Sequence, residues 1–145
     1  MSKQNDKATP LHVHRVVLTA LLIMLVGTAL ELYLLTHYEG VQQLIPLLCI
    51  GVSILVLILL FFQRTKVLKN LFKFVLILTG LSGIYGTFLH LRANYEFELE
   101  MKPTATGWNL FVESLSGALP ALAPCSMIVL ALLGYSYLLL LKHKK

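Results

Sequence analysis

The sequence predicts an all-α membrane protein in which four transmembrane helices form a bundle and an ordered outer loop contains a short interfacial helix. Hydrophobic residues make up 57% of the 145-residue chain and charged residues only 13%. An ordinary soluble domain carries about 25% charged residues. The few charged residues are segregated between long apolar runs. A chain of this length is expected to form a single domain over residues 1–145.

Four apolar runs are long enough to cross a bilayer, which takes about 20 residues of helix. They cover residues 16–36, 44–62, 71–91 and 119–141. Each is apolar on all sides, whereas a helix at the surface of a soluble protein has one apolar stripe. The rest of the chain is too short to bury four such helices, so the lipid bilayer is their expected surroundings. The first run also exceeds the apolar core of a signal peptide, about 7–15 residues, so we expect it to be retained.

Lysine and arginine predict the orientation. Of the twelve, ten precede the first run, separate the second from the third, or follow the fourth. Only Arg92 and Lys102 fall on the other side. The positive-inside rule therefore predicts a multi-pass protein of the bacterial inner membrane with both termini in the cytoplasm. The basic segments hold no aromatic or groove-reading side chains, so no nucleic-acid partner is expected.

The outer loop, residues 92–118, is long for a connection between bundle helices, which usually has about 2–8 residues. Between residues 95 and 101, apolar side chains alternate with glutamates. Strict alternation is the period of a β-strand, which favours an extended segment or a short hairpin. The same residues could instead continue the third helix up to Pro103.

The second half of the loop predicts the short interfacial helix. Trp108, Phe111 and Leu115 share one side at helical spacing, and Asn109 and Glu113 lie on another. Tryptophan favours the headgroup level of a membrane. We therefore expect this helix to lie on the outer membrane surface.

Glu31 is the only charged residue inside the first run. A carboxylate at the centre of a transmembrane helix costs on the order of 2.5–3.5 kcal/mol. We therefore expect Glu31 to face the bundle. Gly27 and Thr28 precede it by one turn on the same face, and small residues mark where membrane helices approach closely.

The third run carries a matching stripe of small and polar residues at spacings of three and four. The stripe consists of Gly83, Gly86, Thr87, His90 and Asn94. We expect its small members to pack against the face of the first helix that holds Glu31.

Glu31 has three interpretations. It could only fix the register of packed helices, as buried polar groups do in some proteins. It could join His90, Glu96 and Glu98 in a site for a divalent metal cation, since histidine with carboxylates suits zinc, manganese or iron. It could also titrate while a proton or cation is transported. No fixed ligand spacing distinguishes the metal site.

Other chemistry finds little support in the sequence. Cys49 and Cys125 are far apart and form no C-x-x-C motif, which argues against a zinc ribbon or a thioredoxin-like site. His37 and His90 are both expected at the rim of the bundle, which argues against a bis-histidine haem. No nucleophile–base pattern, P-loop or dinucleotide fingerprint is present, so we do not expect an enzyme.

Two resemblances concern the layout and the second half of the chain. Four crossings with one acidic residue in the first resemble small multidrug-resistance transporters, although Glu31 is off-centre and the last connection is longer. The segments "FLHLRANYEFELEMKP" and "ESLSGALPALAPCSM" resemble a group of small, uncharacterised bacterial membrane proteins. That resemblance implies a four-helix inner-membrane protein and no particular activity.

The sequence therefore predicts an accessory or binding protein whose acidic, histidine-containing outer face engages a cation or a partner membrane subunit. The alternative is a small proton- or cation-coupled transporter that uses Glu31 and functions as a homo-oligomer.

Overall fold

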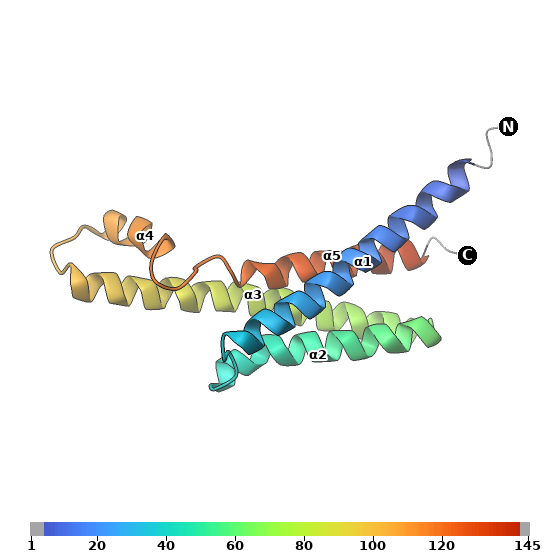
Figure 1. Ribbon diagram of the computed structural model, residues 1–145, viewed down its shortest axis with the longest axis horizontal. Coiled ribbons are helices and arrows are strands. Elements are labelled where there is room, and N and C mark those ends of the chain that lie inside the picture. Colours follow the sequence, from blue (N-terminus) through green and yellow to red (C-terminus); the bar gives the residue numbers. More distant parts are fainter. Residues whose placement is uncertain (1–4, 143–145) are drawn as a thin grey trace.

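The structure of the protein is a computed structural model that describes the backbone of residues 5–142 and the side chains of residues 12–141. Within this part the chain is all-helical and contains no strand (Figure 1). Lys3, Lys144 and Lys145, which contribute to the predicted orientation, lie outside the described residues. The described helices are α1 (Asn5–Leu34), α2 (Val41–Phe62), α3 (Lys66–Met101), α4 (Gly107–Leu115) and α5 (Cys125–Lys142).

Three helices of the described chain are long and apolar enough to cross a membrane: α1 from His12, α2 and α3. The predicted fourth run, residues 119–141, is only partly regular helix. The apolar part of α5 covers Cys125–Leu141. Residues 121–124 precede it as turns, with the Ala123 N–H bonded to the Pro120 carbonyl at 3.1 Å. Pro120 and Pro124 lack the N–H that a regular α-helix needs, which explains the tighter winding here.

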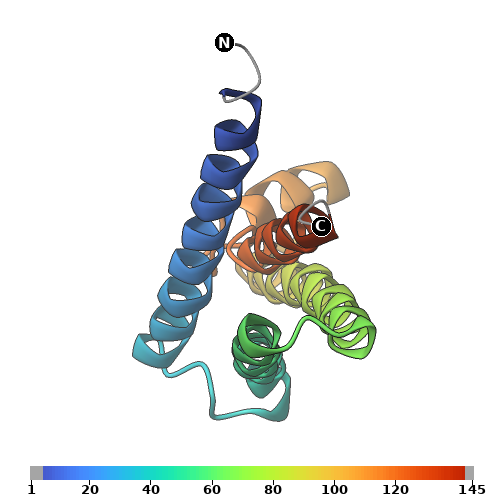
Figure 2. The same ribbon diagram turned by 90° about the vertical axis from the view of Figure 1, so that its right-hand side faces the viewer.

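The bundle is built around α5, which packs against both α3 and α1, while α2 packs mainly against α3 and also contacts α1. Seen end-on, α5 and α2 lie between α1 and α3 (Figure 2). The core where the four helices meet includes Leu25, Ile50, Phe72 and Leu130. The expected packing of the α3 stripe against α1 is therefore wrong.

The α3 stripe instead receives the start of α5. A Cβ atom added to Gly83 would lie 2.8 Å from the Pro124 carbonyl oxygen, and one added to Gly86 would lie 2.9 Å from the Pro124 Cβ. Thr87 hydrogen-bonds the Gly83 carbonyl at 2.9 Å and contacts the Cys125 sulfur at 3.5 Å. The absence of side chains at positions 83 and 86 thus lets the α5 entrance lie directly on α3.

The expected inward orientation of Glu31 is also wrong. Glu31 and Gly27 are exposed, and a Cβ atom added to Gly27 would meet nothing within 4 Å. Thr28, by contrast, is only 7% exposed. The rotation of α1 follows its larger side chains, because Leu21, Leu25, Thr28 and Leu32 form one seam facing the core.

Candidate functional site

The most distinctive part of the structure is a helical arm that extends beyond the bundle. Near the start of α2, Gln42 Nε2 donates a hydrogen bond to the Tyr85 hydroxyl at 3.0 Å. Tyr85 therefore marks the level on α3 beside which α2 begins. At about 1.5 Å per residue, α3 continues for about 24 Å from Tyr85 to Met101. We call residues 88–119 the arm; it contains the distal part of α3, all of α4 and the chain between them (Figure 1).

The expected extended segment at residues 95–101 is wrong, because these residues continue α3 as regular helix. Two side-chain pairs at a spacing of four stabilise this helix. Arg92 Nε lies 2.7 Å from Glu96 Oε1, and Lys102 Nζ lies 3.5 Å from Glu98 Oε2. Such pairs form only when the backbone is helical, since the spacing brings the two side chains onto one face.

The predicted short helix at the second half of the loop is present as α4, and it packs on the distal part of α3. Leu110 and Ser114 form its buried side. Trp108 and Leu115 lie on the opposite side and are exposed, Trp108 by 72%, and the exposed Phe111 lies between the two sides. The strongly apolar side of α4 therefore faces away from α3.

Asn94 fixes the return of the chain from α4 to α5. It is only 2% exposed, and its Nδ2 donates to the Ser114 and Leu119 carbonyls, both at 2.8 Å. Its Oδ1 accepts from the Leu119 N–H at 2.9 Å. Gly117 lies so close that an added Cβ would be 2.6 Å from the Asn94 Cγ. One amide thus satisfies three backbone groups, one in the last turn of α4 and two at Leu119 in the irregular segment that follows.

Lys102 holds the tip of the arm together. Its Nζ lies 2.8 Å from Glu113 Oε2 on α4 and 3.5 Å from Glu98 Oε2 on α3. The hydrogen bond from Lys102 to Glu113 raises the lysine pKa above its usual value, and the charges of Glu113 and Glu98 act in the same direction. Because this site is solvent-exposed, the pairs orient the tip more than they stabilise it.

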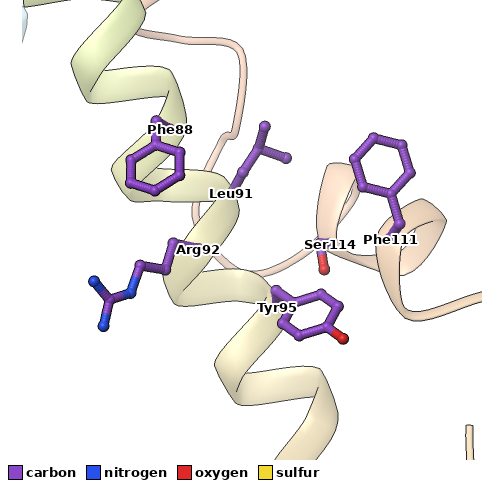
Figure 3. A pocket seen from close by; sticks show the side chains of 6 residues that line it. All are labelled: Phe88, Leu91, Arg92, Tyr95, Phe111 and Ser114. Carbon is purple, nitrogen blue, oxygen red and sulfur yellow. The ribbon is translucent and has the colours of Figure 1, made fainter. Parts of the chain in front are cut away.

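A cavity of about 330 Å³ lies between α3 and α4 at the base of the arm. Figure 3 shows Phe88, Arg92 and Tyr95 on successive turns of α3, with Phe111 across from them on α4. The Arg92 side chain points away from α4, toward its partner Glu96. The cavity wall is therefore almost entirely apolar. Its lining residues are Phe88, Leu91, Arg92, Tyr95, Phe111 and Ser114.

Two histidines meet where the arm leaves the bundle. The rings of His37 and His90 have centroids 6.4 Å apart and planes inclined by 67°. The His90 Nδ1 lies 3.1 Å from the Pro120 carbonyl oxygen. Burial, and then the nearby His90, lower the pKa of His37 below its ordinary value of 6.5.

The turn that carries His37 has an unusual backbone. Thr36 follows the end of α1 with a φ of 52°, in the left-handed region. The His37 N–H bonds the Leu32 carbonyl at 2.8 Å, which ends the helix in the way a glycine usually allows. A non-glycine residue in this conformation costs roughly 1–2 kcal/mol. The conformation directs the chain, and His37 with it, back toward α3.

The structure does not bring the predicted metal ligands together. His90 lies beside His37, Glu96 pairs with Arg92, and Glu98 pairs with Lys102. Glu31 is exposed on α1. Among the described residues, no group of three or more histidine, cysteine, aspartate or glutamate side chains could hold one metal ion.

Two features of this region were not the favoured prediction from the sequence. The helical course of residues 92–102 was only the alternative, although the pairs Arg92/Glu96 and Glu98/Lys102 have a spacing of four, which competes with the alternation of apolar residues. The pairing of His37 with His90 had no signal, because it depends on how the turn after α1 folds back.

With the geometry described, similarity to known proteins adds nothing further. No protein-family model, no curated protein and no solved structure matches this chain. The function is therefore argued from the arm and from the region where it joins the bundle.

Proposed function

We propose that the chain is an integral protein of the bacterial inner membrane with four crossings and both termini in the cytoplasm. The crossings are α1, α2, the part of α3 up to about Tyr85, and α5. Three of these helices have the length and apolarity that a crossing needs. For the fourth, the turns at residues 121–124 add length to α5. The concentration of lysine and arginine at the opposite end from the arm supports the orientation.

Within this arrangement, we propose that the arm is a docking site for a partner membrane protein, so that the chain is an accessory subunit with a binding role. The observation that carries this proposal is the apolar face of α4. Trp108, Val112 and Leu115 are exposed on the side of α4 away from its buried residues, and Phe111, also exposed, lies at the edge of this face beside α3. An exposed apolar patch of this kind is typical of a protein interaction site. Bilayer lipid ending near Tyr85 would leave most of this face uncovered.

The charges of the arm indicate the chemistry of the partner. Four carboxylates, those of Glu96, Glu98, Glu100 and Glu113, accompany only two cations, Arg92 and Lys102. Two copies of this arm placed face to face would bring like charges together, which disfavours association. The surface instead fits a different protein that presents apolar side chains within a basic rim.

Site-specific photo-cross-linking in native membranes tests this function. A photoreactive phenylalanine analogue is placed at Trp108, Phe111 or Leu115, and at Asn109 as the matched control on the polar side of α4. We expect one adduct mass shared by the first three positions and absent at Asn109. We also expect its yield to fall in the Glu100→Lys variant, because Glu100 belongs to the acidic flank.

Two outcomes would contradict the partner subunit. Adducts with twice the mass of the chain would show that the arm binds a second copy. Equal cross-linking at Asn109 and Trp108, or none at either, would show that α4 presents no docking face.

The alternative of a transporter that uses Glu31 receives no support from the arrangement of a single chain. A titrating carboxylate in a transport path needs neighbouring helices or water around it. Glu31 lies instead on the exposed side of α1, away from α3 and α5.

A further inference from the structure

Three segments converge where the arm leaves the bundle. His37 comes from the turn between α1 and α2, His90 from α3, and the Pro120 carbonyl from the chain that enters α5. Both histidines are half-buried. Helices α1 and α3 each pack against α5. The contact between the two histidines in addition connects the α1–α2 turn to α3.

The hydrogen bond to Pro120 determines the state of His90. A carbonyl oxygen can only accept, so the ring Nδ1 carries the proton. The Nε2 of the neutral ring then holds a free lone pair. A backbone carbonyl on one ring nitrogen is the usual support of a metal-binding histidine, because it fixes the tautomer and the ring orientation.

His37 provides the second ring. It lies beside the His90 ring and is also half-buried. Its backbone N–H is bonded to the Leu32 carbonyl at 2.8 Å, which ties the backbone of His37 to the end of α1.

The two rings lie near each other and would have to approach further to share one ion. Imidazole nitrogen binds zinc at about 2.0–2.1 Å, so two rings on a tetrahedral ion have centroids about 5 Å apart. The observed separation is 6.4 Å. Rotation of the two half-buried side chains would therefore have to bring the rings about 1 Å closer.

We propose that His37 and His90 bind a divalent transition-metal ion of the kind that prefers imidazole, such as Zn²⁺. The protein supplies two ligands, and water completes the coordination. This site shares His90 with the predicted set of Glu31, His90, Glu96 and Glu98 and contains none of its carboxylates. The ion would clamp the α1–α2 turn to α3 at the base of the arm. The proposal does not depend on whether the arm docks a partner.

Zinc binding to the purified, untagged protein in detergent tests the site, with a chromogenic chelator as competitor. We expect one equivalent of Zn²⁺ to bind per chain. His37→Ala and His90→Ala should each weaken binding at least as much as loss of a second-shell partner does, about 10- to 100-fold. His12→Ala is the matched control, because His12 is an exposed histidine near the opposite end of α1.

Electron paramagnetic resonance with Cu²⁺ in place of Zn²⁺ counts the nitrogen ligands directly. We expect two imidazole nitrogens in the wild type and in His12→Ala, and one in each single variant. His37→Gln, a substitution in a turn, carries the test if His90→Ala does not fold. Absence of saturable binding in the wild type, or unchanged binding in His37→Ala and His37→Gln, would overturn the proposal.

Discussion

Asn94 shows how much of the arm depends on one side chain. The chain from Ser116 to Leu119 follows α4 without regular secondary structure, and a buried backbone group without a partner is costly. Asn94 bonds the Ser114 carbonyl in the last turn of α4 and both backbone groups of Leu119. The close approach of Gly117 shows that the segment is fitted to this amide.

Replacing Asn94 by alanine is expected to release residues 114–119 from α3. The buried groups left without partners should cost about 1–3 kcal/mol. Hydrogen exchange of the amides in this segment measures the effect, and we expect faster exchange there and unchanged exchange in the α1 and α2 amides. Asn109→Ala is the control, because Asn109 is exposed on α4. Equal protection in both variants would contradict the role of Asn94.

At the level of helices, glycine has different roles at different positions. Gly83 lies against the backbone of Pro124, which cannot move aside as a flexible side chain would. Gly27 lies on the exposed side of α1 with open space around it. The sequence suggested a packing role for both, but of the two only Gly83 lies close to a neighbouring segment.

The matched pair Gly83→Ala and Gly27→Ala tests this difference. Gly83→Ala should destabilise the protein by about 1–3 kcal/mol, as expected for overpacking. Gly27→Ala should be neutral or stabilising by up to about 1 kcal/mol, because alanine is the better helix former. Unfolding by denaturing detergent compares both variants with the wild type. Similar destabilisation in both would show that α1 packs through Gly27.

For the whole molecule, the proposed topology puts the arm and the loop between α2 and α3 on opposite sides of the membrane. We expect a cysteine at Thr104, an exposed residue at the tip of the arm, to react with an impermeant thiol reagent added to intact cells. A cysteine at Gln63, exposed just after α2, should react only after permeabilisation. The unsubstituted protein gives the background from Cys49 and Cys125. The reverse pattern would invert the proposed topology.

The all-α class, the approximate positions of the apolar helices and the presence of α4 could be predicted from the sequence. These depend on local hydrophobicity and on helical spacing, which are properties of neighbouring residues. Which face of each helix turns inward depends on how the helices pack against one another. Helix α1 is apolar on all sides. Its rotation therefore follows the larger seam of leucines that packs in the core, and the single carboxylate of Glu31 does not determine it.

The candidate sites were decided by tertiary structure for the same reason. His90 and Asn94 were recognised in the sequence, but their partners lie on segments remote in the chain: His37 in the turn after α1, and Ser114 and Leu119 beyond α4. Glu96 and Glu98 were also recognised as candidate ligands. In the structure they pair locally with Arg92 and Lys102 and do not contact His90. Contacts between remote segments follow from how the helices pack, and a pattern of neighbouring residues does not contain that information.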